Sequence, residues 1–188
     1  MYIFCKRDVA VCCCWKKSFN NYFSNLLFVE INLVSDNVVC YNFIRIFLLW
    51  MDFMEEHIKI ISERFAKDSL MALATVDEKG TPWCRTIDAI FIEDSFYTIT
   101  YALSNKIKHI EKNPQVAISG DWFSGHGIGQ NIGYIKSPEN EKIANALRTA
   151  FASWYDNGHT NEDDPNTIIL KIKLTGGTLF SNGKRFDF

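Results

Sequence analysis

Residues 69–101 constrain the fold more than any other part of the chain, because they place three short strands around two tight turns. The segments SLMALATV (69–76) and SFYTITY (95–101) predict strands, and a longer strand between them alternates strictly in its side chains over 83–92. The turn residues DEKG and ED separate these strands. Strands joined by such short turns pair antiparallel, so this part of the chain argues against a doubly wound α/β fold.

The chain on both sides of residues 69–101 contains further helix and strand signals. Apolar residues at helical spacing predict a helix from Met54 to Phe65. A second long helix is expected from the Ser137-Pro138 start signal to Gly158. Further strands are predicted at 115–122, 167–174 and 178–182, with a turn at Gly176-Gly177 between the last two, and a glycine-punctuated stretch occupies 123–135. The sum is a mainly β fold with peripheral helices, and its meander-like order favours a small antiparallel barrel.

Residues 1–50 differ in composition from the rest. They contain no Gly, no Pro and one Ala, whereas all ten glycines and all four prolines follow. Three interpretations fit this N-terminal extension: a leader translated upstream of a true start at Met51 or Met54, a segment that associates with a membrane or a partner, or an integral part of the fold. We therefore divide the chain into an atypical extension, 1–50, and one domain, 51–188.

The net charge of the chain and the lengths of its apolar runs limit where the protein is expected and what it can bind. The net charge of −2 and the scattered lysines provide no basic surface for nucleic acid. The two apolar runs of the extension are interrupted by Glu30 and Arg45, and neither reaches the roughly 18 to 20 residues that a membrane span needs. The six cysteines include no CxxC pair. We expect a cytoplasmic protein that binds neither nucleic acid, membrane nor metal.

The segment ALSNKIKHIEKNP predicts a short helix that begins at Ser104 and ends before Pro114. A helix N-terminus exposes unpaired N–H groups and favours an anion. Lys106 adds a point charge, and Arg85 lies on an otherwise apolar strand face, where an unpaired charge is costly. Together they indicate a phosphate site. Simpler interpretations remain: Ser104 only caps the helix, Lys106 is solvated, and Arg85 pairs with Asp88 or Glu93.

The hairpin, the strand with Arg85 and the stretch FYTITYALSNKIKHIEKNPQVAIS together resemble the FMN-binding split barrel of the pyridoxamine 5'-phosphate oxidase-like family. The resemblance covers residues 54–135 best and implies a homodimer with the flavin at its interface. It implies that Arg85, Ser104 and Lys106 hold the FMN phosphate. The residues that would line the rest of the flavin site are Thr86, Ile87, Asp88, Ile99, Thr100 and Asn105, with Gln130 and Asn131 from the glycine-rich segment.

The sequence also departs from true pyridoxamine-phosphate oxidases, which carry Lys at the position of Ile90 and Arg at that of Asn105. The C-terminal GKRFDF has no His after Arg185. The resemblance therefore implies an FMN-dependent oxidoreductase other than a vitamin B6 oxidase, which takes electrons from NAD(P)H and reduces a small organic acceptor, as a nitroreductase does. The alternative is a flavin- or haem-binding module without turnover, and a third interpretation is a cofactor-free dimer.

The segment GHGIGQNIG has two interpretations. Its glycines allow the backbone to approach a ligand closely, with His126 as a speculative catalytic residue or haem ligand. Alternatively, the segment is a bulged and strongly bent barrel strand. His57 and His109 are expected on solvated helix surfaces.

Overall fold

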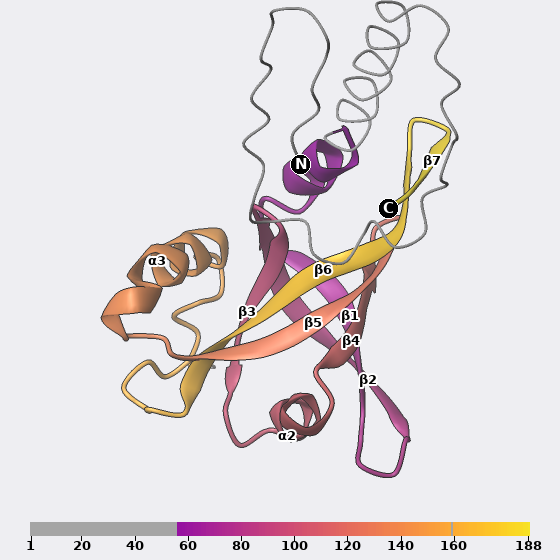
Figure 1. Ribbon diagram of the computed structural model, residues 1–188. Helices are drawn as coiled ribbons and strands as arrows, with labels where there is room; N and C mark the ends of the chain where they lie inside the picture. The colour runs from indigo at the N-terminus through magenta and orange to yellow at the C-terminus, as the bar shows by residue number, and fades with distance from the viewer. Residues whose placement is uncertain (1–55, 159) are drawn as a thin grey trace, which may run out of the picture. The chain divides into compact units, whose positions relative to one another are not determined.

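The computed structural model describes residues 56–158 and 160–188, so the interpretations of residues 1–50 lie outside it. In the described part, seven strands form one antiparallel sheet in the order β3-β2-β1-β4-β5-β6-β7. Strand β3 also pairs with β6, which closes the strands from β3 to β6 into a barrel, while β7 extends β6 beyond it (Figure 1). The prediction of an antiparallel split barrel with peripheral helices is confirmed.

The strands are β1 (Ser69–Val76), β2 (Pro82–Ile92), β3 (Ser95–Tyr101), β4 (Gln115–Gly120), β5 (Phe123–Tyr134), β6 (Thr167–Ser181) and β7 (Lys184–Asp187). The helices are α2 (Asn105–Lys112), the 3₁₀ turn η1 (Pro138–Asn140) and α3 (Glu141–Ala150), together with a helix over residues 56–64. No helix in these described ranges has the length and apolar character needed to cross a bilayer.

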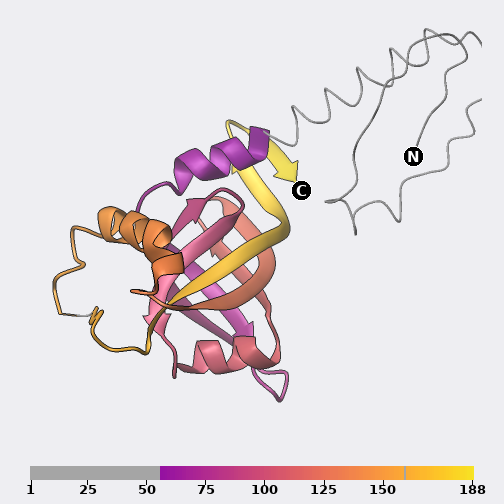
Figure 2. The same cartoon turned by 60° about the vertical axis from the view of Figure 1, so that its left-hand side comes forward.

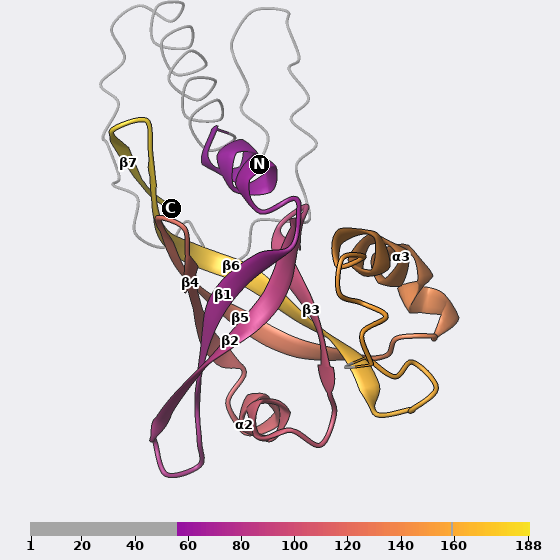
Figure 3. The same cartoon turned by 180° about the vertical axis from the view of Figure 1, so that it is seen from behind.

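Two helices cover the open ends of the barrel. The helix over 56–64 lies at one end and α2 at the other, as the opposite views in Figures 1 and 3 show. Ile61 and Ile107, one from each helix, are fully buried in the same apolar core. Each helix closes its end because its apolar stripe faces inward, as the helical spacing of these residues predicts.

The third helix, α3, lies outside the barrel wall, against β3 (Figure 2). Leu147 and Phe151 are fully buried there and form a second apolar cluster with Tyr97 and Ile169. Strand β3 is therefore buried on both faces over residues 95–98. This explains why its sequence is apolar or small at both alternating positions.

The glycine-rich segment is a strand, so the second of its two interpretations is confirmed. Within β5, Phe123, Gly125, Gly127 and Gly129 face the interior in strict alternation. A Cβ at Gly127 would lie 2.2 Å from the backbone oxygen of Lys173, so no larger residue fits. The pairing with β6 shifts register at His126/Gly127 and again between Asn131 and Tyr134. Such bulges bend a strand strongly, as barrel closure requires.

Three sequence-based boundaries are wrong. The Gly176-Gly177 pair is not a turn but lies inside the long strand β6. A Cβ at Gly177 would lie 2.7 Å from the carbonyl oxygen of Ser124, so this glycine serves close strand packing. The turn lies instead at Asn182-Gly183, both with positive φ, and leads into β7, which the sequence did not reveal.

The other two errors concern element ends. Strand β4 stops at Gly120, because Asp121 and Trp122 have positive φ and form the turn into β5. Helix α3 ends at Ala150 instead of reaching Gly158. Beyond it, Trp154 is bonded to Asp68, so tertiary contacts override helix propensity in this segment.

Candidate functional site

A cavity of about 200 Å³ lies where β2, β3 and α2 meet the segment that follows α3. Strand β2 contributes four consecutive residues to it, 85–88, and β3 contributes 98–100. Lys106 reaches it from α2. The sequence-predicted residues that the structure brings together here are Arg85, Thr86, Ile87, Asp88, Ile99, Thr100 and Lys106, and those that sequence reasoning missed are Thr98, Phe151 and Trp154.

Arg85 and Lys106 form the cationic end of this cavity. Arg85 Nη1 donates to the carbonyl oxygen of Leu73 at 3.2 Å and to Thr75 Oγ1 at 2.7 Å. Lys106 Nζ donates to Thr100 Oγ1 at 2.7 Å and lies 3.5 Å from Ser104 Oγ. In residues 56–158 and 160–188 neither cation makes an ion pair with a carboxylate.

Burial lowers the pKa of both cations, and the charge of Arg85 lowers that of Lys106 further. Two desolvated, mutually repelling positive charges are unfavourable unless an anion compensates them. This end of the cavity is therefore suited to a ligand that carries a concentrated negative charge.

The described contacts bear on the simpler interpretations of these three residues. Ser104 is the N-cap residue of α2, but its side chain makes no cap hydrogen bond, so its hydroxyl is not used for capping. Lys106 is half-buried and therefore not fully solvated. Among the described residues Arg85 makes no ion pair with Asp88 or Glu93, and Glu93 pairs with Lys142. Asn105, in contrast, is exposed at the start of α2 and does not line the cavity.

A buried hydroxyl connects Arg85 to a histidine that sequence reasoning placed in solvent. Thr75, 1% exposed, accepts from Arg85 and lies 3.0 Å from His109 Nδ1. His109 is half-buried, with its ring 6.0 Å from that of Trp83. His57 is also buried, with its ring stacked 4.3 Å from that of Phe188. The sequence signal that could have indicated the Thr75–His109 contact was a threonine on the inward face of an otherwise apolar strand.

An acidic residue, Asp88, also lines the cavity. Burial raises the pKa of Asp88, and the neighbouring carboxyl group of Asp68 raises it further. Trp154 Nε1 donates to Asp68 Oδ2 at 2.5 Å. Asp68 and Trp154 are 86 residues apart in the sequence, so no local pattern could have indicated this contact.

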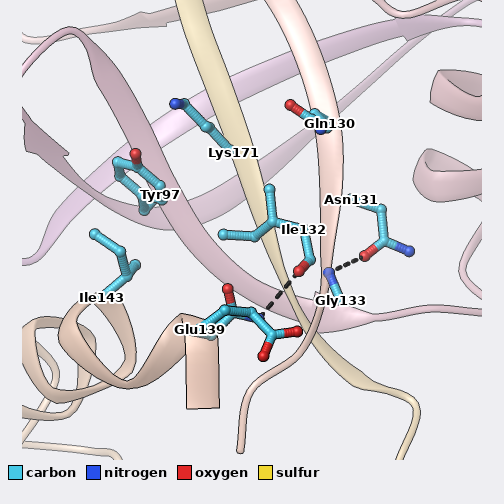
Figure 4. Close-up of a pocket in the computed structure, with 9 residues that line it drawn as sticks. Tyr97, Gln130, Asn131, Ile132, Gly133, Glu139, Ile143 and Lys171 are labelled. Carbon is cyan, nitrogen blue, oxygen red and sulfur yellow. Dashed lines mark hydrogen bonds between the residues drawn. The ribbon is translucent and has the colours of Figure 1, made fainter. Parts of the chain in front are cut away.

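Gln130 and Asn131 lie in a different pocket, of about 600 Å³, between β5 and η1 (Figure 4). Asn131 Oδ1 accepts from the backbone N–H of Gly133 at 2.8 Å. Gln130 is paired across the sheet with Lys171, which also lines this pocket. Within one chain, these two predicted residues are thus separate from the cavity at Arg85.

His126 lines neither pocket. It is exposed on β5, and its Nδ1 lies 2.9 Å from Thr175 Oγ1. The structure therefore does not bring this residue to the site where the other predicted residues meet.

Beside the cavity, the outer surface of four adjacent strands has no charged side chain at its fully exposed positions, and the half-buried Asp88, paired with Leu70, is the carboxyl group on this face. Cross-strand pairs such as Ala72↔Ser119 and Ala117↔His126 place these residues on one face. About a quarter to a third of an ordinary surface is charged. This uncharged face consists of Leu70, Ala72, Cys84, Thr86, Gln115, Ala117, Ser119, Ser124, His126 and Ile128.

Known proteins resemble this chain in sequence and in fold. The sequence model of the family described as Pyridoxamine 5'-phosphate oxidase matches residues 58–180. No curated protein matches the chain significantly in sequence. General Stress Protein 26 from Bacillus anthracis str. Sterne superposes with a TM-score of 0.52 at 19% identity, over 70% of this chain and 99% of that one.

Two further solved structures share the fold. A candidate pyridoxamine 5'-phosphate oxidase from Listeria innocua has a TM-score of 0.50 at 16% identity, over 70% of this chain and 99% of that one. A heme binding protein from Mycobacterium smegmatis has a TM-score of 0.51 at 11% identity, over 68% of this chain and 55% of that one. At these identities the likeness concerns the fold alone.

Proposed function

Because this chain belongs to the pyridoxamine 5'-phosphate oxidase family, we propose that it binds FMN in the cavity between β2 and β3. We further propose that it acts as an oxidoreductase, which takes electrons from NAD(P)H and reduces a small organic acceptor. The observation that carries the proposal is the joint presence of Arg85 and Lys106 in one cavity, without a carboxylate partner among the described residues.

The phosphate of FMN fits the cationic end. A phosphate monoester carries about −1.5 to −2 charges at neutral pH and offers three strong acceptor oxygens. Arg85 provides a planar fork of donors, Lys106 a point charge, and the Ser104 hydroxyl, close to Lys106 Nζ, a further donor. These groups would bind the phosphate and thereby fix the position of the remaining nucleotide.

The rest of the site would orient the flavin. Thr86, Ile87 and Asp88 form one wall, and Trp154 another. Bound FMN would itself supply the electron transfer. The protein's part is to hold the phosphate, to exclude water with the aromatic wall and to present polar groups to the ring.

One chain does not enclose such a ligand. Ligand pockets usually measure about 300–1,000 Å³, whereas this cavity measures about 200 Å³. The uncharged face supports a homodimer, because a surface without exposed charged side chains is suited to burial against a second copy. In that dimer, Gln130 and Asn131 would reach the flavin from the partner subunit, which would account for their separation from Arg85 within one chain.

The test is reconstitution of the full chain with FMN and, separately, with riboflavin, which lacks the phosphate. We expect a yellow protein and a lower Kd for FMN than for riboflavin. Equal affinity for both, or binding of neither, would contradict the site. Consumption of NADH or NADPH by the FMN-loaded protein, with and without a nitroaromatic acceptor, then separates the enzyme from the alternative, a flavin-binding module without turnover.

A further inference from the structure

We propose that Thr75 and His109 are positioning residues for Arg85: together they hold its guanidinium so that one edge is left to bind the phosphate group of a ligand. The inference rests on the proposed function, because it concerns how the cationic end of the cavity binds the phosphate of FMN. Neither Thr75 nor His109 lines the cavity, so both act through Arg85.

The first observation is a hydroxyl group that an apolar strand buries. Met71, Leu73 and Thr75 are the buried positions of β1 in strict alternation, and Thr75 is 1% exposed. Valine has nearly the same shape without the hydroxyl, whereas burying a hydroxyl is unfavourable unless it is hydrogen-bonded. The presence of threonine at this core position is therefore explained by what its hydroxyl binds.

The second observation is the use of the donors of Arg85. Its Nη1 atom donates to the carbonyl oxygen of Leu73 and to Thr75 Oγ1, both on the paired strand β1. A guanidinium has five N–H donors, and those on Nε and Nη2 donate to no residue in the ranges that the structure describes. The edge formed by Nε and Nη2 is a fork that can bind two oxygens of one phosphate.

The third observation gives the direction of the bond between Thr75 and His109. Arg85 can only donate to the threonine oxygen, so the hydroxyl hydrogen is left for His109 Nδ1, 3.0 Å away. His109 Nδ1 is then the acceptor, and the ring carries its hydrogen on Nε2. Because the hydroxyl accepts on one side and donates on the other, its rotation is fixed, and with it the lone pair that Arg85 contacts.

Helix α2 determines the position of both cations in this way. Lys106 and His109 are three residues apart and are therefore neighbours on one side of the helix, where both are half-buried. Lys106 reaches the cavity directly, whereas His109 acts on it through Thr75 and Arg85. The ring of His109 lies 6.0 Å from that of Trp83, which limits its movement in turn.

A positioned guanidinium binds more tightly than a mobile one. A long side chain that becomes immobile only on binding loses conformational entropy, and this loss weakens the affinity. Removal of the Thr75 hydroxyl should therefore raise the Kd for FMN by about 2- to 12-fold, the equivalent of immobilising one such side chain. The Kd for riboflavin should not change, because riboflavin has no phosphate for Arg85 to bind.

The test is titration of the full chain and its variants with FMN and with riboflavin. Thr75→Val removes the hydroxyl at nearly constant shape and should lose part of the preference for FMN, whereas Thr75→Ser keeps the hydroxyl and should retain that preference. Thr167→Val is the matched control, because Thr167 is also buried and donates to the carbonyl oxygen of Asn161 at 2.5 Å but does not line the cavity. Near-UV circular dichroism verifies the fold of each variant.

His109 provides a second pair of variants in case Thr75→Val does not fold. His109→Leu removes the acceptor of the threonine hydroxyl and should raise the Kd for FMN alone. His109→Asn places an amide oxygen at the same number of bonds from the backbone as Nδ1, so it should restore the preference for FMN.

The outcomes separate this inference from the proposed function. If the wild type prefers FMN to riboflavin and Thr75→Val does so to the same extent, Thr75 does not position Arg85. Equal weakening of FMN and riboflavin in Thr75→Val, or the same loss in Thr75→Ser, also overturns the inference and leaves the flavin site in place. A wild type that binds FMN no more tightly than riboflavin contradicts the phosphate site itself, and the proposed function fails with it.

Discussion

Replacing Lys106 by methionine is the most direct test of the proposed phosphate site. The change keeps the apolar stem of the side chain and removes the ammonium group that lies between Thr100 and Ser104. A phosphate bound at this end of the cavity would lose one charge-assisted hydrogen bond. The hydroxyl of Ser104 and the guanidinium of Arg85 would remain.

The expected loss follows from that bond. Hydrogen bonds to charged groups contribute about 1.5–3 kcal/mol, which corresponds to a roughly 10- to 150-fold rise in the Kd for FMN. The stability of the ligand-free protein should change little. The variant loses the hydrogen bond of a charged ammonium group to Thr100, worth about 1.5–3 kcal/mol, but it also loses a charge that burial and Arg85 disfavour. These two effects oppose each other.

The assay is titration of ligand-free protein with FMN and with riboflavin, followed by the quenching of flavin fluorescence. Lys106→Met should weaken FMN binding and leave riboflavin binding unchanged, because only FMN carries the phosphate. Lys108→Met is the matched control, since Lys108 is exposed on the same helix and does not line the cavity. Urea unfolding of both variants verifies that the fold is intact.

Two results would refute the reasoning. If Lys106→Met weakens FMN and riboflavin binding equally, the lysine does not contact the phosphate. If FMN binds equally to Lys106→Met, Lys108→Met and the wild type, then the cationic end of the cavity is not the binding site.

Three further predictions concern stability and assembly. Gly127→Ala should lower the free energy of unfolding in urea by about 1–3 kcal/mol or more, because its Cβ would lie 2.2 Å from the backbone oxygen of Lys173. If the proposed dimer forms through the uncharged face, Ala117→Glu should convert it to a monomer in analytical ultracentrifugation, because the substitution would bury a charge there. The folded state retains the proton of Asp88 to higher pH than the unfolded state does, since its pKa is raised. As the pH rises from 3.8 through that raised pKa, the ionisation of Asp88 therefore lowers the free energy of unfolding. Asp88→Asn should remove this part of the pH dependence of stability.

Each of these predictions has its own control. Gly129→Ala should cost less than Gly127→Ala, since its Cβ meets only the side chain of Ile110, at 3.1 Å, which can move. Lys59→Glu, exposed on the helix over 56–64, should leave the sedimentation of the protein unchanged. A dimer that survives Ala117→Glu would show that the uncharged face is not the interface. The same pH profile of stability in Asp88→Asn and the wild type would show that Asp88 titrates normally in the folded protein.

Much of the fold was accessible from the sequence, because strand and turn signals are local. The alternation along 83–92 and the turn residues on each side correctly predicted β1, β2 and β3 as successive antiparallel strands. The segment of α2 was recognised from its start and stop residues, and Arg85 and Lys106, which the sequence singled out together, line the same cavity. These features depend on the preferences of neighbouring residues and on the side-chain period of a strand.

What only the tertiary structure decided depends on segments far apart in the chain. Closure of the barrel by β3 and β6 determines where glycine is needed, so Gly177 lies against β5 rather than in a turn. Thr75 contacts His109, and Asp68 contacts Trp154, although the residues are far apart in the sequence. The local sequence around each residue does not predict which partner it contacts. Local preference determined which segments are strands, whereas the packing of the closed barrel determined which polar groups share a cavity.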